Sequence, residues 1–178
     1  MMPPSSGDER EFGDRICRLG DPRLRPALER LVGRQMRDIC PNGFWNPGES
    51  HCAHFVSHIL GLEFGCTCAE LTSTDAGAGA GNVRVHEIFA RCDQVGRWEV
   101  REQAGDCLIF VSKPTAFNAA TRMLINIPNK HIGICCGSDV FHYSSRHDAV
   151  LKKTVDQFLT YFEQAYSGQQ ALYFGTIA

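Results

Sequence analysis

Apolar residues recur at helical spacing in two stretches of the first half of the chain. In the first stretch they lie three or four positions apart: Leu24, Leu28, Leu31 and Val32. Asp21 and Pro22 precede them, and this pair is typical of an N-cap followed by proline at the first helical position. The pattern predicts a helix that begins near Asp21 and ends near Cys40.

The second apolar stretch predicts a helix that carries a cysteine in its first turn. Its apolar face consists of four residues: Phe55, Val56, Ile59 and Leu60. Gly61 is placed to end the helix, and Ser50 is a candidate N-cap just before Cys52. The free N–H groups and the positive dipole end of a helix favour a thiolate, so Cys52 is a candidate nucleophile.

The second half of the chain changes to strand-like runs. These cover residues 98–101, 106–112, 131–136, 140–144 and 172–177, with further helices expected at about 83–92 and 150–162. Helices that cluster before strands are typical of an α+β domain. We therefore expect an α+β fold with N-terminal helices packed on a small antiparallel sheet.

The length and local composition predict one domain with a mobile arm. Residues 1–20 are polar and rich in proline, glycine and serine at their start, which predicts a mobile N-terminal arm. Residues 21–178 are long enough for one hydrophobic core and too short for two. Residues 72–82 alternate glycine with small residues, which predicts a flexible loop.

Charge and hydropathy argue against several classes of protein. The chain of 178 residues has a formal net charge of −2, which provides no basic field for nucleic acid. It has no apolar run long enough for a membrane span, and its start lacks the apolar core of a secretory signal. Nine cysteines, an odd number with some adjacent, favour free thiols or a metal site over a full set of disulfides.

Two histidines are candidate partners of the Cys52 thiol. A nucleophilic cysteine needs a base within hydrogen-bond reach and a third group that orients the base. His131 opens one predicted strand and His142 lies on the next, so a turn at residues 137–139 would bring the two imidazoles together. The sequence thus offers a Cys52–His131–His142 triad, with Asp139 as an alternative orienting residue.

The order of four motifs resembles the NlpC-type cell-wall cysteine peptidases, a papain-like family. The motifs are the helix that begins at Cys52, the strand from Gly105 to Phe110, the run from Lys130 to Ile134, and the run from Val140 to Tyr143. The family has a cysteine helix, a Gly-Asp-Leu-Ile-Phe strand, a His-Val-Gly-Ile strand and a second histidine in this order. The resemblance covers about residues 40–145, and its specificity lies in the ordered set.

The resemblance implies a papain-like hydrolase that cuts amide bonds in peptidoglycan stem peptides. Cys52 would be the nucleophile, His131 the general base and His142 the orienting residue, with no cofactor and no metal. Trp45, Asn46 and His51 are the candidates for oxyanion and substrate contacts. The chain departs from the family here, because His51 and Ala53 flank the cysteine where the family has aspartate and serine, and the usual tyrosine is missing.

The resemblance also suggests partners and a location. Small amidases of this type without a signal sequence include toxins that type VI secretion delivers into rival bacteria. We therefore expect a monomer made in the bacterial cytoplasm and exported to a target-cell periplasm, with a possible immunity protein as its partner.

Three alternatives remain. The residues from His51 to Val56 also resemble the lecithin retinol acyltransferase family, whose histidine precedes its cysteine, whereas the reverse order holds here. Cys52 could instead be a buried structural thiol. A zinc-stabilised binding module is the third alternative, with candidate ligands at His51, His54, His58, Cys66 and Cys68, although their spacing fits no standard Cys/His motif.

Overall fold

The centre of the molecule is a six-stranded antiparallel sheet. The computed structural model describes residues 17–62, 64, 68, 84–101 and 105–178. The strand order is β1-β8-β2-β5-β6-β7, and every neighbouring pair is antiparallel. The strands are β1 (Gln94–Arg97), β2 (Cys107–Ser112), β5 (Lys130–Cys136), β6 (Asp139–Ser144), β7 (Ala149–Thr154) and β8 (Ala171–Thr176). β3 (Phe117–Asn118) and β4 (Met123–Leu124) form a separate pair.

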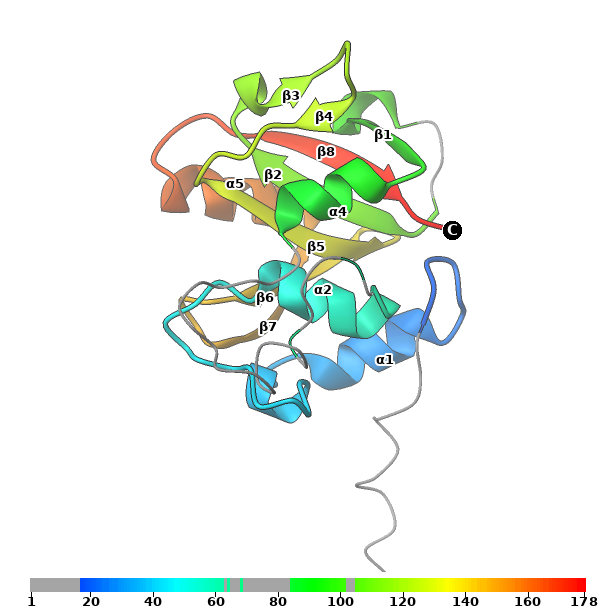
Figure 1. The fold of residues 1–178 in the computed structure, drawn as a ribbon, viewed down its shortest axis with the longest axis vertical. Coiled ribbons are helices and arrows are strands. Elements are labelled where there is room, and N and C mark those ends of the chain that lie inside the picture. The colour runs from blue at the N-terminus through cyan, green and yellow to red at the C-terminus, as the bar shows by residue number, and fades with distance from the viewer. Residues whose placement is uncertain (1–16, 63, 65–67, 69–83, 102–104) are drawn as a thin grey trace, which may run out of the picture.

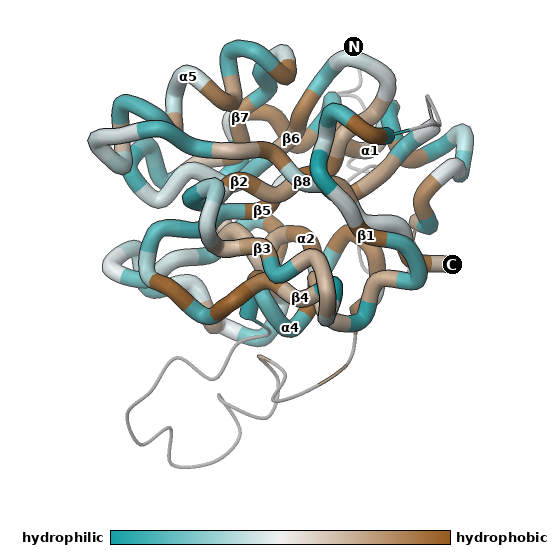
Figure 2. The backbone as a smooth tube through the Cα atoms, turned by 90° about the horizontal axis from the view of Figure 1, so that it is seen from above, coloured by the Kyte–Doolittle hydropathy of each residue, from teal (hydrophilic) through white to brown (hydrophobic). Residues whose placement is uncertain are grey.

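Helices cover both faces of the sheet. On one face the buried residues of α1 (Leu24–Leu31), α2 (Cys52–Leu60) and α4 (Val85–Arg91) join the larger hydrophobic cluster. On the other face α5 (Val155–Ala165) packs through Phe158 and Phe162. Figure 2 shows α5 on one side of the central strands and α2 with α4 on the other, and Figure 1 shows α1 beside α2. The fold is therefore a mixed α+β arrangement with an antiparallel sheet, as the sequence predicts.

The alternation of residues along β5 decides which side chains face which helices. Ile132, Ile134 and Cys136 belong to the cluster under α2, whereas Cys135 belongs to the cluster under α5. Successive side chains of a strand point to opposite faces, so His131 shares the α5 face with Cys135. The same alternation that buries the isoleucines under α2 therefore turns His131 towards α5.

The second predicted helix is confirmed, with one change at its start. It begins at Cys52 and ends before Gly61, whose φ of 61° is the left-handed conformation that glycine adopts easily. His51 occupies the N-cap position, and no side chain caps the helix there. The hydroxyl of Ser50, the predicted cap, lies 3.5 Å from the Cys52 thiol instead.

The first predicted helix is shorter than the sequence pattern suggests. α1 ends at Leu31, and Gly33 follows with a φ of 82°. A short 3-10 helix, Met36–Asp38, covers part of the remaining range. The strand predicted at residues 98–101 is also wrong, because β1 ends at Arg97 and residues Trp98–Val100 form a 3-10 turn.

The prediction of one helix over residues 150–162 is wrong in its first part. Residues Ala149–Thr154 form β7, which pairs with β6, and the helix begins only at Val155. Thr154 marks the change, because its hydroxyl accepts a hydrogen bond from the backbone N–H of Gln157 and the Gln157 side chain accepts one from the Thr154 N–H. A capping box thus separates the strand from the helix.

Two predicted segments lie mainly outside the described residues: most of the N-terminal arm (residues 1–16) and the loop at 72–82. The described end of the arm is part of the core, because Cys17 is buried and its N–H donates to the Ile59 carbonyl at 3.3 Å. Within the part of the chain that is described, no helix has both the length and the apolar character needed to cross a bilayer.

Candidate functional site

Cys52 is the first residue of α2 and lies against the backbone of β5. α2 packs on β5 and β6, so its first residue, Cys52, lies in the hydrophobic cluster that includes Ile132 of β5. Ile132 follows His131 directly in the chain. The structure therefore places the candidate nucleophile beside the strand that carries the candidate base.

The Cys52 thiol is buried, and this outweighs the effect of the helix end. Only 3% of the residue is exposed. Burial raises the pKa of the thiol above its usual value, while the Ser50 hydroxyl and the backbone N–H groups of Ile132, Ala53 and Cys52 act in the opposite direction. The sequence predicts a thiolate favoured by the helix dipole, whereas the resting structure favours the neutral thiol because desolvation is the larger effect.

His131 and His142 form a direct pair, as the sequence predicts. Nε2 of His131 lies 3.0 Å from Nδ1 of His142, and the two rings are nearly perpendicular at 82°. The turn with Gly137 at a φ of 64° joins their strands, and pairing between β5 and β6 runs from Ile134 and Phe141 to that turn. The predicted hairpin is therefore present, and it brings together the two imidazoles.

Aromatic rings of α5 surround the histidine pair. His131 stacks on Phe162 with ring centroids 4.3 Å apart, and His142 contacts Phe158 at 5.1 Å. Burial, and then the neighbouring His142, hold the pKa of His131 well below its usual value. Burial, followed by Lys153 and His147, lowers the pKa of His142 to about 3. Both imidazoles are therefore neutral in the resting protein at neutral pH.

The thiol and the imidazoles approach from different sides of β5. Cys52 belongs to the hydrophobic cluster under α2, whereas the two histidines face α5. Among the described residues, no hydrogen bond joins the Cys52 thiol to His131 or His142. The three residues thus lie on α2, β5 and β6, which pack together, with no hydrogen bond between the thiol and either imidazole.

The three residues predicted for oxyanion and substrate contacts differ in their exposure and in their hydrogen bonds. Trp45 is 44% exposed. The Asn46 side chain accepts a hydrogen bond from the Gly48 N–H at 3.1 Å, and the Asn46 carbonyl lies 2.7 Å from Nε2 of His51. His51 is buried, so it belongs to the interior and not to an accessible rim.

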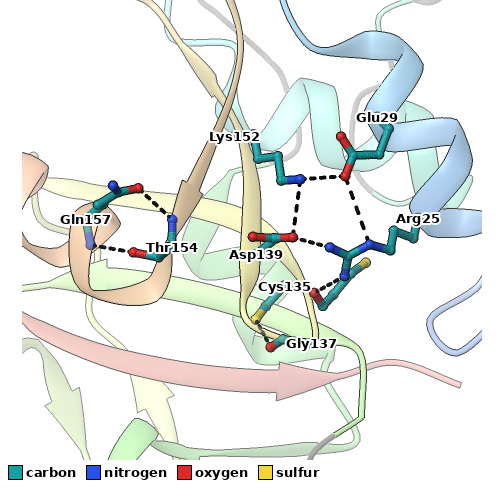
Figure 3. A network of polar contacts seen from close by, with 9 residues as sticks. Arg25, Glu29, Cys135, Gly137, Asp139, Lys152, Thr154 and Gln157 are labelled. Atoms are coloured by element: carbon teal, nitrogen blue, oxygen red, sulfur yellow. Dashed lines mark hydrogen bonds and ion pairs between the residues drawn. The ribbon is translucent and has the colours of Figure 1, made fainter.

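Asp139, the alternative orienting residue, has other partners. Its carboxylate pairs with Arg25 of α1 and with Lys152 of β7, and Figure 3 shows these two cations approaching it from their separate elements. The partner of His131 is therefore His142 and not Asp139.

A second cluster of reactive side chains includes two residues of the helix that carries Cys52. Four potential metal ligands, one atom each, lie within 4.8 Å of one another: Cys40, His54, His58 and Cys68. The sequence predicts three of these four and misses Cys40, while Cys66 lies outside the described residues. His51 contacts His54 but is not a member of the group.

Comparison of the chain with protein-family models, curated proteins and solved structures found no match.

Proposed function

We propose that the protein is a papain-like cysteine hydrolase that cleaves amide bonds through Cys52, His131 and His142. The observation that carries the proposal is that Cys52 opens α2 in the same cluster as Ile132, the residue after a histidine whose Nε2 is hydrogen-bonded to a second histidine. Nucleophile, base and orienting group thus come from α2, β5 and β6, in the order in which the cysteine peptidases use them.

The direction of the histidine hydrogen bond defines the chemistry. His131 is a base for the thiol only if its Nδ1 has a free lone pair, so its Nε2 must donate to Nδ1 of His142. His142 then holds the ring of His131 in one tautomer and one orientation. Cys52 and His131 approach β5 from different sides in the free protein, so the proposal requires that substrate binding bring the thiol to Nδ1 of His131.

The reaction that follows is acyl transfer. Nδ1 of His131 takes the thiol proton as the sulfur of Cys52 attacks the carbonyl carbon, and the C–N bond breaks as the imidazolium returns that proton to the leaving amine. Water, deprotonated by the same imidazole, then releases the acid and restores the thiol. The backbone N–H of Cys52 is the candidate donor to the oxyanion, because it opens α2 and carries the positive end of the helix dipole.

The substrate is proposed from the resemblance of the motifs to the cell-wall peptidases. A peptidoglycan stem peptide is a short chain of amide bonds and has no requirement for a basic surface, which agrees with the net charge of −2. Delivery by type VI secretion and inhibition by an immunity protein belong to the same proposal. Toxicity to bacteria only when the chain is directed to the periplasm would support this setting.

The decisive experiment is digestion of purified peptidoglycan, with product analysis of the released muropeptides. The wild-type protein should release products that contain a new amine and a new carboxylate, and Cys52→Ala should lower the rate at least about a thousandfold. Cys136→Ala is a matched control, because Cys136 is equally buried in the same hydrophobic cluster and lies on β5. It should keep the wild-type rate.

Three results would contradict the proposal. These are no digestion by folded wild-type protein, equal digestion by Cys52→Ala, or an equal loss in the Cys136→Ala control. A parallel assay with a thioester substrate separates an amidase from an acyltransferase, since an acyltransferase would turn over the thioester and leave the peptide amide intact.

A further inference from the structure

Four side chains from three parts of the chain place their ligand atoms in one small group. His54 and His58 lie one turn apart on α2, and their Nε2 atoms are 3.1 Å apart. Cys40 follows the 3-10 helix Met36–Asp38, and its sulfur lies 3.8 Å from that of Cys68. The sulfur of Cys68 lies 3.5 Å from Nε2 of His58.

Three of the six separations match the edges of a zinc tetrahedron, and all four ligand atoms lie within 4.8 Å of one another. Zn²⁺ bound at about 2.3 Å by sulfur and about 2.0 Å by nitrogen gives edges of about 3.8 Å between sulfurs, 3.5 Å between sulfur and nitrogen, and 3.3 Å between nitrogens. The three printed distances, 3.8, 3.5 and 3.1 Å, each agree with the matching edge to within a few tenths of an ångström. Hydrogen bonds between these groups have similar lengths, so the inference rests on the convergence of two sulfurs and two imidazole nitrogens in one group.

The hydrogen bonds around His54 direct a lone pair at the centre of the group. The Asn46 carbonyl can only accept, so Nε2 of His51, 2.7 Å away, carries the hydrogen of that ring. Nδ1 of His51 then accepts from Nδ1 of His54 at 3.2 Å. Nε2 of His54 is left without a hydrogen, and it faces Nε2 of His58 within the group. Such a chain from ligand to backbone carbonyl is typical of metal-bound histidine.

Hydrogen-bond donors surround the two sulfurs. The Asn42 side-chain amide donates to the sulfur of Cys68 at 2.9 Å. Burial raises the pKa of the Cys40 thiol, and the backbone N–H groups of Asn42 and Phe44 act in the opposite direction. Donors of this kind stabilise negative charge on sulfur, which is the ionisation state that a thiolate ligand needs.

We propose that Cys40, His54, His58 and Cys68 bind one Zn²⁺ in a closed tetrahedral site. Two sulfurs and two imidazoles are a ligand set that selects zinc among the common divalent ions, and four protein ligands leave no open position for catalysis. Binding displaces the two thiol protons to solvent, so the site takes up the metal as a bis-thiolate. The ion ties the segments that contain Cys40 and Cys68 to α2, and its role is structural.

The inference does not depend on the proposed hydrolase activity, because its readout is the metal itself. We expect close to one Zn²⁺ per chain by elemental analysis of the whole protein, and the loss of most of it in Cys68→Ser and His58→Gln. Cys92→Ser and His86→Gln are matched controls, since both residues are half-buried and neither belongs to the group. They should keep the wild-type zinc content.

A second measurement applies if a ligand variant fails to fold. X-ray absorption of the wild-type protein should give two sulfur and two nitrogen neighbours, and replacement by Co²⁺ should give the visible bands of a tetrahedral site with thiolate ligands. Folded protein that takes up no zinc from excess Zn²⁺ would overturn the inference. So would a coordination shell without sulfur, or an equal loss of zinc in the ligand variants and the controls.

Discussion

Nε2 of His131 and Nδ1 of His142 are 3.0 Å apart, and this bond is buried beneath α5. The other nitrogen of His142, Nε2, is buried and has no hydrogen-bond partner among the described residues. A buried polar atom without a partner costs free energy, and structures keep such atoms at functional sites more readily than elsewhere. The burial of the histidine pair can therefore be tested by measurements of stability, and its proposed role in catalysis by measurements of rate.

The buried histidines should make the protein sensitive to acid. The pKa of His142 is lowered from 6.5 to about 3 by burial first, so the unfolded chain binds a proton that the folded protein does not. The stability due to the neutral form is complete above about pH 6.5 and is lost as the pH falls from there towards about 3. In denaturant titrations at several pH values, wild type should lose stability over this range, and His142→Gln should lose less.

His147→Gln is the comparison for this measurement: it replaces an exposed histidine that contributes less than burial and Lys153 to the lowered pKa of His142, so it should change the acid response less than His142→Gln does. An acid response in His142→Gln as steep as in wild type would show that other groups dominate the effect of pH.

The two histidines should differ in their effect on rate. His131→Ala removes the base and should lower kcat/KM by about 10²–10⁴-fold. His142 acts through His131, so His142→Asn should retain much of the rate because an amide oxygen can accept the hydrogen from Nε2 of His131, whereas His142→Ala should not. The pH profile of kcat/KM checks the assignment: a positioning role requires that His142→Ala shift the limb that reports the His131 base.

Gly133 keeps β5 and β6 close beside the histidine pair. A Cβ at this position would lie 2.9 Å from the Phe141 carbonyl oxygen and 3.2 Å from the Cβ of His142. Gly133→Ala should therefore cost about 1–3 kcal/mol of stability, because a backbone atom has to move. Gly105→Ala is the matched control, as nothing lies within 4 Å of its added Cβ. Equal midpoints of denaturation for the two variants would contradict the prediction.

The ion pairs of Asp139 join α1 to the edge of the sheet (Figure 3). Arg25 and Lys152 are 47% and 34% exposed, so solvent weakens their attraction to the carboxylate. Asp139→Asn should cost no more than about 1 kcal/mol at low ionic strength and less at high salt. Denaturation of both proteins at two salt concentrations measures the difference, and a cost that does not change with salt would indicate a packing effect instead.

The helix of Cys52 and the hairpin of His131 were predictable because local signals agree there. Gly61 ends an apolar helical stretch, and two strand-like runs flank the glycine turn at residue 137. The start of β7 was not predictable in the same way. Val150 and Leu151 fit a helix as well as a strand, and only their pairing with β6 decides between the two.

The candidate metal ligands also show that sequence spacing alone finds only part of a group assembled by the tertiary fold. His54 and His58 were visible from their spacing on one helix, but Cys40 lies outside that spacing and reaches the group only through the tertiary fold. One signal could have found it: Cys40 precedes proline, asparagine and glycine, and this turn chemistry lets backbone N–H groups point at a sulfur. The opposite orientation of Cys52 and His131 around β5 depends on packing, which no local pattern contains.

α2 is nine residues long and carries Cys52 at its first position, with His54 and His58 within the next two turns. A helix this short moves as a rigid unit, so a change that tilts it to suit Cys52 also displaces His54 and His58. Replacements of ligands that touch one another, such as His54 and His58, are expected not to sum in measurements of unfolding. Mutations that adapt this helix to new chemistry would therefore have to arise in concert.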